Sequence, residues 1–376
     1  MMAKLGDIAT YINGYAFKPQ DWSDEGIPII RIQDLTGNSY QANRYNGEYA
    51  SKYEVNDGDV LISWSASLGV YIWHGEKAVL NQHIFKVVFD KERISKDFFV
   101  HQVGLILENA ASDAHGATMK HLTKPVFDAL PFYLPPYEKQ CEIAEVLDKV
   151  TSLISLRKQQ LAKLDELVKA RFVEMFGEPS SNPMGWLQTT VGAECYYIKD
   201  GPHKSLTDVG MENGYPFISV RNIVNGYIDF STAKYISEAD YKDAIKKCCP
   251  EKGDILYSKG GTTGIAKLVD IDIKFANWVH LAVLKFNHNE FNGSFFEKML
   301  NCDYCYKQSQ MLTKGIANRD LVLSAMAQIK IYKPPILLQN QFAAFVERVD
   351  QQKQTVQQSL EKLELMKKAL MQEYFG

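Results

Sequence analysis

Polar and basic side chains in two glycine-led loops are the residues best suited to bind a nucleic acid. Lys120 and His121 follow one glycine, and a second loop carries three such side chains. Arg and Lys pair with guanine in the major groove, Asn and Gln pair with adenine, and either cation can hold a phosphate. For each residue alone, a solvated surface charge is an equally good interpretation. The candidate DNA contacts are Arg31, Gln33, Ser65, Lys120, His121, Arg221, Asn222, Lys259, Thr262, Lys314, Asn318 and Arg319.

Lys120 and Arg319 occupy matching places in these two loops. Each stands two residues before a matched leucine, Leu122 or Leu321. A basic side chain kept where its neighbours differ indicates a feature common to any two DNA sequences, which is the phosphate backbone. We therefore expect phosphate contacts from both residues.

Two short motifs resemble parts of enzyme sites but lack a decisive residue. The segment 259–264, KGGTTG, does not end in the Gly-Lys-Ser/Thr of a P-loop, so we expect a turn with some backbone phosphate contact. Adenine methyltransferases hold the target amine with an Asx-Pro-Pro-aromatic motif, and here Pro135, Pro136 and Tyr137 follow Leu134. Leucine cannot accept a hydrogen bond. We therefore expect a strand-to-helix connector and no catalytic residue.

The cysteines do not form a pattern typical of a metal site. Cys302 and Cys305 form a CxxC pair, but Cys248 and Cys249 are adjacent to each other, which suits four ligands around a tetrahedral zinc poorly. We expect reduced, structural thiols, no metal and no disulfide framework.

Length and charge limit the class of protein. A chain of 376 residues is too long for one core, so two or more domains are expected. With a net charge of −3, any nucleic-acid contact must come from local basic faces. We find no signal-peptide pattern and no apolar run long enough for a membrane span, and we expect a cytoplasmic protein.

A long segment that must position these loops occurs twice. Residues 135–177 match residues 334–376 without a gap, each starting with Pro-Pro and ending with Phe-Gly. A repeat of this length indicates a duplicated unit. Both copies carry apolar residues in alternating steps of four and three, which predicts long helices in a coiled coil. The predicted helix–helix seam comprises Leu147, Val150, Ile154, Leu161, Leu164 and Val168 with Val346, Val349, Val356, Leu360, Leu363 and Leu370.

An antiparallel arrangement of the two helices keeps like charges apart. With full overlap, Arg157 faces Leu360 and Arg171 faces Val346. Roughly 38 helical residues at 1.5 Å each form a rod of about 57 Å, which exceeds one DNA turn of about 34–36 Å. We expect this rod to hold the two preceding bodies apart.

The segments before the two helices repeat the same order of strands, turns and helices. Gly58 and Asp59 match Gly253 and Asp254, whereas the loops that follow differ, SWSASLG against SKGGTTG. One scaffold with two loop chemistries implies two ligands, or two halves of one asymmetric ligand. The predicted fold class is α+β, with two similar mixed α/β, mostly β, bodies joined by an antiparallel coiled coil in a pseudo-twofold arrangement. The predicted boundaries are 1–136, 137–177, 178–335 and 336–376.

Over nearly its whole length the chain resembles the specificity subunit of type I restriction-modification enzymes. The most specific local matches are LPPYEKQ and VKARFVEMFGEP in the first copy, and KPPILLQNQ and KKALMQEYFG in the second. One departure is that Leu337 and Leu338 replace the Glu138 and Lys139 of the first copy. Contacts made by the two helix starts are therefore expected to differ.

The resemblance implies a function and a set of partners. Each body would be a target recognition domain that reads one half of a bipartite, asymmetric double-stranded DNA target. The helices would set the spacer and dock two methyltransferase subunits, and restriction subunits would join through the complex. The chain would be no enzyme and carry no cofactor, since S-adenosylmethionine, ATP and Mg²⁺ would bind to the partners. The alternatives are a structural coiled-coil adaptor without a DNA role and, least favoured, a DNA methyltransferase.

Overall fold

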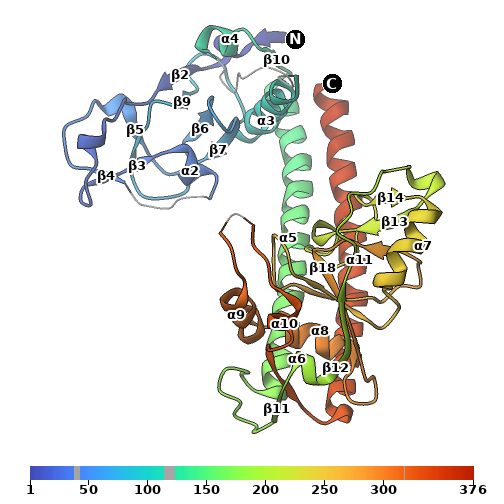
Figure 1. Cartoon of the computed structure of the whole chain (residues 1–376). Helices are drawn as coiled ribbons and strands as arrows, with labels where there is room; N and C mark the ends of the chain where they lie inside the picture. The colour runs from blue at the N-terminus through green and yellow to red at the C-terminus, as the bar shows by residue number, and fades with distance from the viewer. Residues whose placement is uncertain (38–42, 114–122, 317) are drawn as a thin grey trace. The chain divides into compact units, whose positions relative to one another are not determined.

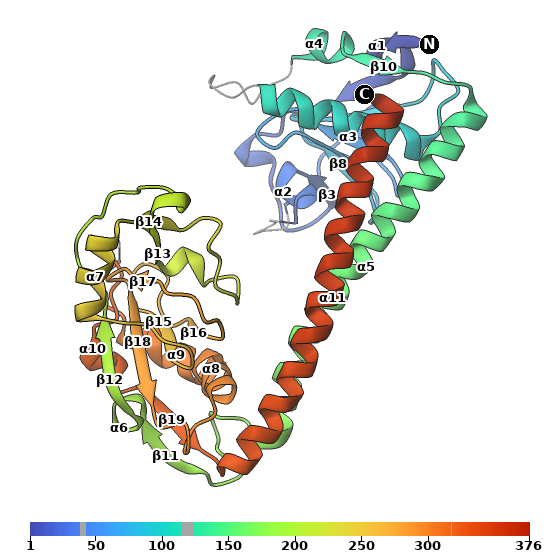
Figure 2. The same ribbon diagram turned by 90° about the vertical axis from the view of Figure 1, so that its right-hand side faces the viewer.

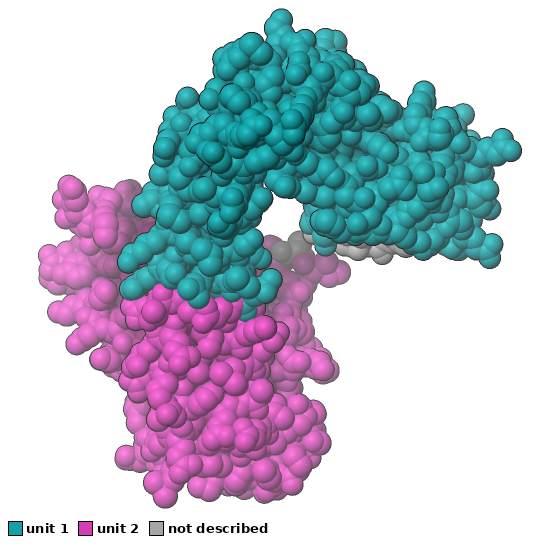
Figure 3. Space-filling view, turned by 180° about the vertical axis from the view of Figure 1, so that it is seen from behind, with its two compact units in different colours: residues 1–159, 357–376 teal, residues 160–356 magenta. Residues whose placement is uncertain are grey.

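The computed structural model describes residues 1–37, 43–113, 123–316 and 318–376 (Figure 1). Two compact units are distinguished, one formed by residues 1–159 with 357–376 and the other by residues 160–356 (Figure 3). Each unit holds one body together with part of each long helix. No helix in the described ranges is both long and apolar enough to cross a membrane.

The two long helices are α5 (Tyr137–Phe176) and α11 (Ile336–Phe375) (Figure 2). Each begins directly after a Pro-Pro pair, and proline is well tolerated at a helix start. After α5, Gly177 adopts a φ of +77° and donates its N–H to the Val173 carbonyl at 2.8 Å. This left-handed geometry favours glycine and ends the helix.

Within each unit the two helices run antiparallel, as predicted. In the first unit, Leu147 near the start of α5 shares a core with Leu370 near the end of α11. Close by, the Arg157 guanidinium donates to the Ser359 hydroxyl at 3.3 Å. In the second unit, Val168 near the end of α5 shares a core with Val346 near the start of α11.

The predicted seam is buried to different degrees along its length. Seven of its members are buried, namely Leu147, Val150, Val168, Val346, Val349, Val356 and Leu360. The other members are half-buried, namely Ile154, Leu161, Leu164, Leu363 and Leu370.

The body of the first unit is built on two four-stranded sheets. In the first sheet the order is β2-β9-β6-β7, all antiparallel, and in the second it is β4-β3-β8-β5, with β3 and β8 parallel. The strands are β1 (Met2–Lys4), β2 (Thr10–Asn13), β3 (Ile27–Ile30), β4 (Arg44–Tyr45), β5 (Glu54–Val55), β6 (Val60–Ser63), β7 (Gly69–Ile72), β8 (Ala78–Leu80), β9 (Ile84–Val88) and β10 (Pro131–Tyr133). The helices are α1 (Leu5–Ile8), α2 (Ile32–Leu35), α3 (Lys96–Asp113) and α4 (Lys124–Asp128).

The body of the second unit repeats this plan. Its antiparallel sheet has the order β12-β18-β15-β16, and in the sheet β14-β13-β17 the strands β13 and β17 are parallel. The strands are β11 (Leu187–Thr190), β12 (Cys195–Asp200), β13 (Tyr215–Ile218), β14 (Lys234–Ile236), β15 (Ile255–Ser258), β16 (Ala266–Leu268), β17 (Ala276–Asn277), β18 (Leu281–Phe286) and β19 (Lys330–Lys333). The helices are α6 (Val191–Glu194), α7 (Glu238–Lys247), α8 (Gly293–Asn301), α9 (Asp303–Leu312) and α10 (Leu323–Met326).

A buried glutamine ties each long helix to its body in the same way. The Gln140 carboxamide accepts from the N–H of Ser95, the residue before α3, and donates to the Pro135 carbonyl, both at 2.9 Å. The Gln339 carboxamide accepts from the N–H of Asn292, the residue before α8, at 2.9 Å and donates to the Pro334 carbonyl at 2.8 Å. The sequence repeat therefore extends to individual hydrogen bonds.

We predict that Gln339→Leu lowers the free energy of unfolding by about 1–3 kcal/mol, because it leaves a partly buried N–H and a buried carbonyl without their partner. Urea denaturation followed by circular dichroism would measure the change. Gln352→Leu, at an exposed position of the same helix, is the matched control. Equal stability of the two variants would contradict the role given to Gln339.

Candidate nucleic-acid interface

Two loops of the second body that are far apart in sequence lie side by side. We call residues 259–264 together with residues 314–316 and 318–320 the paired loops. The Gly261 N–H donates to the Arg319 carbonyl at 3.1 Å, and the Leu321 N–H donates to the Lys259 carbonyl at 2.7 Å. The fold thus joins the glycine-rich segment to the glycine-led loop, which the sequence presented as separate candidates.

A glycine at one position of the paired loops is required by both conformation and space. Gly315 has a φ of +83°, and a Cβ there would lie 2.3 Å from the Asn318 carbonyl oxygen. A side chain at this position would collide with backbone, which cannot move away cheaply. The loop can therefore make its turn at this position only with a glycine.

Four predicted DNA contacts are exposed on the paired loops. They are Thr262, Lys314, Asn318 and Arg319. The Arg319 guanidinium is held from one side, since it donates to the Gln310 side chain of α9 and to the Thr263 hydroxyl, the latter at 3.4 Å. The Arg319 guanidinium is therefore held in a defined position at the surface, where it can bind an anionic ligand.

Lys259 was predicted as a DNA contact, but in the structure its ammonium forms ion pairs with two carboxylates of the same body. The side chain is buried, with its ammonium 3.0 Å from Asp320 and 3.5 Å from Asp200. A buried cation between two carboxylates is already neutralised. Its side chain therefore organises the paired loops, and we correct its role from ligand contact to positioning.

Asn222 also belongs to the interior. Its side chain is 1% exposed, accepts from the Ser219 N–H at 2.8 Å, and donates to the Asp229 carbonyl at 2.9 Å. The amide caps the single turn Val220–Asn222, so it cannot reach a base edge. The neighbouring Arg221 is exposed, and its guanidinium donates to the Thr232 carbonyl at 2.9 Å.

A basic cavity opens beside Arg221 on the second body. It has a volume of about 290 Å³, and its lining combines Lys204, Arg221 and Lys234 with the rings of Phe217 and Trp278. The Lys204 ammonium donates to the Asp243 carboxylate at 3.0 Å, and this hydrogen bond raises the pKa of Lys204. Cations beside an aromatic face suit a phosphate and a base or sugar.

The ring of His280 connects the basic cavity with the paired loops. Its ring centroid is 4.6 Å from that of Trp278, and a Cβ on Gly260 would lie 2.4 Å from the same imidazole. We call the cavity and the paired loops together the second-body surface. Sequence analysis missed Lys204, Lys234 and His280. Of these, Lys234 could have been found by predicting the pairing of its strand with the strand that carries Phe217.

The first body has different side chains at equivalent places. Trp64 follows β6 as Lys259 follows β15, and its indole N–H donates to Asn13, the last residue of β2, at 3.2 Å. Lys259 contacts Asp200, the last residue of β12, in the corresponding arrangement. The scaffold thus places an aromatic–amide pair in one body and an ion pair in the other.

The remaining candidate DNA contacts of the first body that the structure describes are half-buried. Arg31 is half-buried with its guanidinium 5.1 Å from the centre of the Trp22 ring, and Gln33 and Ser65 are half-buried. Lys120 and His121 lie outside the described residues.

No group of three or more His, Cys, Asp or Glu side chains in the described ranges could hold a metal ion. The six cysteines are all free thiols.

We predict that Asn222→Ala destabilises the protein and that Arg221→Ala does not. The first removes a buried cap and should lower the free energy of unfolding by about 1–3 kcal/mol. The second changes an exposed side chain and should leave that free energy within about 0.5 kcal/mol of the original. Thermal unfolding of the two variants side by side measures this difference. A stable Asn222→Ala protein would show that the amide is not needed by the loop.

Comparison with known proteins identifies the family. The model of the type I restriction modification DNA specificity domain matches residues 1–166 and 198–365. The specificity subunit of the type I restriction enzyme EcoBI from Escherichia coli is 26% identical over 306 residues, which cover 73% of this chain and 64% of that protein. The MjaVIII specificity subunit from Methanocaldococcus jannaschii is 23% identical over 98% of this chain and 90% of its own length.

A solved structure gives the same result for the fold. The S subunit of a type I restriction-modification system from M. genitalium matches with a TM-score of 0.59 at 15% identity, covering 100% of this chain and 96% of that one. Because the family model matches most of the sequence in two copies, the chain belongs to the family defined by the type I restriction modification DNA specificity domain.

Proposed function

We propose that the chain is the DNA-specificity subunit of a type I restriction-modification complex, with each body reading one half of a bipartite, asymmetric target. The observation that carries this proposal is the pair of equivalent positions after β6 and β15. One holds Trp64 with Asn13, and the other holds Lys259 with Asp200. A duplicated scaffold with unlike side chains at one place is what two unlike half-sites require.

The second-body surface is the proposed contact with one half-site. Its exposed cations, Arg319 and Lys314, are suited to phosphates, while Asn318 and Thr262 can offer hydrogen bonds to base edges. In the first body, Arg31, Gln33 and Ser65 are the proposed counterparts, together with Lys120 and His121. The proposed division of the chain is into recognition domains at 1–136 and 178–335 and spacer helices at 137–177 and 336–376.

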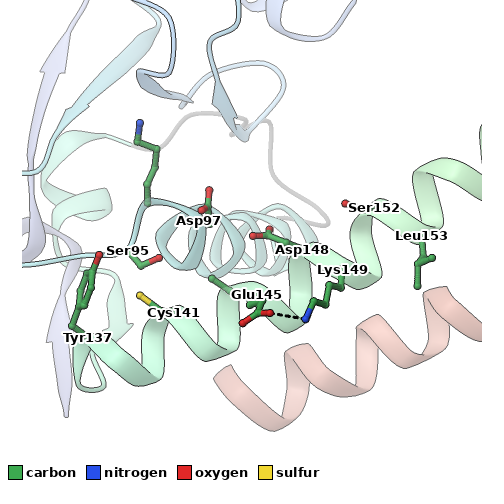
Figure 4. A pocket seen from close by; sticks show the side chains of 11 residues that line it. Ser95, Asp97, Tyr137, Cys141, Glu145, Asp148, Lys149, Ser152 and Leu153 are labelled. Carbon is green, nitrogen blue, oxygen red and sulfur yellow. Dashed lines mark hydrogen bonds and ion pairs between the residues drawn. The ribbon is translucent and has the colours of Figure 1, made fainter.

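Methyltransferase subunits are the proposed partners of the helix starts. A groove of about 780 Å³ lies between α3 and the start of α5, lined by Tyr137, Cys141 and Asp148 among others (Figure 4). The second unit has a groove of about 640 Å³ between α8 and the start of α11. Two related grooves support docking of two related subunits. Restriction subunits would join through that complex.

The proposed subunit performs no chemistry itself. Its only methyltransferase-like motif begins with Leu134, which cannot accept the hydrogen bond of a target amine. Methyl transfer and DNA cleavage would fall to partners that bind S-adenosylmethionine, ATP and Mg²⁺.

Exchanging one body tests the proposed function. We predict that replacing residues 1–134 by the matching body of a related subunit changes one half of the recognised DNA sequence and leaves the other half unchanged. The reason is that each body has its own core and its own loops. Selection of bound sequences from a random DNA library would measure both halves. If the exchanged protein still folds but recognises neither half, the two bodies are not independent sites. If the unaltered chain does not bind DNA, the alternative of a structural coiled-coil adaptor is favoured.

Arg319→Ala tests the proposed phosphate contact. Binding should weaken similarly for all DNA sequences, and the slope of log affinity against log salt should fall by about 0.9. Fluorescence anisotropy at several salt concentrations gives this slope. Arg348→Ala, at an exposed position of α11 away from the second-body surface, is the control and should leave the slope unchanged. An unchanged slope with relaxed preference at one base pair would show that Arg319 reads a base instead.

A further inference from the structure

The CxxC pair of the second body sits at the junction of two helices. Cys302 separates α8 from α9 and is the residue that precedes the first turn of α9. Cys305 lies in that first turn, three residues after Cys302, and its thiol donates to the Lys330 carbonyl of β19 at 3.6 Å. Two thiols in this arrangement at the start of a helix are typical of dithiols that can be oxidised to a disulfide.

The two thiols differ in access. Cys302 is half-buried and lines a cavity of about 260 Å³, together with Lys169 and Phe172 of α5 and Lys298 of α8. Cys305 is fully buried in the core of the second unit. A small oxidant can therefore reach Cys302 first, while Cys305 is held beside it and away from solvent.

The thiols also differ in acidity. The neighbouring Cys305 thiol lowers the pKa of Cys302, and the neighbouring Cys302 together with burial raises the pKa of Cys305 well above its ordinary value. Elsewhere, burial raises the pKa of Cys195 to about 12 and of Cys248 to about 11. Because the thiolate is the nucleophile, Cys302 is the member of this set that is prepared to react.

We propose that Cys302 and Cys305 form a thiol–disulfide redox pair, in which Cys302 is the reactive thiol and Cys305 closes the disulfide. The pair is a modification site made of residues other than the proposed DNA contacts. It goes beyond the structural role expected from the sequence, and it needs no metal.

With hydrogen peroxide as the oxidant, the reaction has two steps. The Cys302 thiolate attacks one peroxide oxygen, the O–O bond breaks, and the leaving hydroxide takes up the proton released from Cys302 to form water. The sulfur of Cys305 then attacks the resulting sulfenic acid, the S–S bond forms, and the S–O bond breaks. A second water leaves with the Cys305 proton. The two thiols lose two electrons in total, and the peroxide gains them.

The test uses the reduced full-length chain treated with hydrogen peroxide at neutral pH. Alkylation of the remaining thiols followed by peptide mass spectrometry should find one intramolecular disulfide between Cys302 and Cys305, with a loss of two free thiols per chain. This bond should form before Cys141 is oxidised, although Cys141 is exposed. Oxidation of Cys141 while both members of the pair remain reduced would overturn the proposal.

Three variants assign the roles. In Cys305→Ser, the sulfenic acid at Cys302 should persist and be trapped by dimedone, whereas in Cys302→Ser the rapid peroxide reaction should be lost. The control Cys141→Ser should form the disulfide at the original rate. If Cys302→Ser reacts as fast as the parent, Cys302 is not the nucleophile. Because the disulfide is first mapped in the unaltered chain, an unfolded variant does not remove the test.

Discussion

Packing of aromatic side chains shared by helix and body is the interaction on which the rest of the structure depends. In the second unit, Phe172 and Phe176 of α5 lie 5.7 and 4.7 Å, between ring centroids, from Phe295 of α8. The Phe342 ring of α11 lies 5.5 Å from Phe172. Buried aromatic residues contribute large apolar areas and preferred ring geometries. The ends of the long helices therefore belong to the body core and cannot separate from it without opening that core.

This constraint explains how the loops can vary while the scaffold is kept. The first unit uses the same principle, with Phe375 of α11 5.4 Å from Phe98 of α3. Because the core and the buried glutamines hold each body to its helices, residues at the ends of β2, β6, β12 and β15 are free to differ. Those positions carry Trp64 with Asn13 in one body and Lys259 with Asp200 in the other. Exposed loop residues such as Thr262 and Asn318 can then be substituted with little effect on stability.

Periodicity and the internal repeat predicted the α+β fold, the two long helices and their antiparallel pairing, because these depend on local pattern. The side chains of the interface were harder to predict. The interior position of Lys259 depends on Asp200 and Asp320, which lie far away in sequence and become neighbours only in the folded body. Asn222 could have been recognised, since Ser219 and Asn222 have the spacing of a helix cap. His280 gave no local signal, because its importance comes from its contact with Gly260.

The central claim is that one chain presents two unlike recognition surfaces to DNA. The most direct test is to map adenine methylation across the genome of a host that expresses this chain with its methyltransferase subunit. The account predicts one methylated motif made of two different half-sites separated by a constant number of unspecified bases. A contiguous motif, two identical half-sites or methylation unrelated to sequence would contradict it.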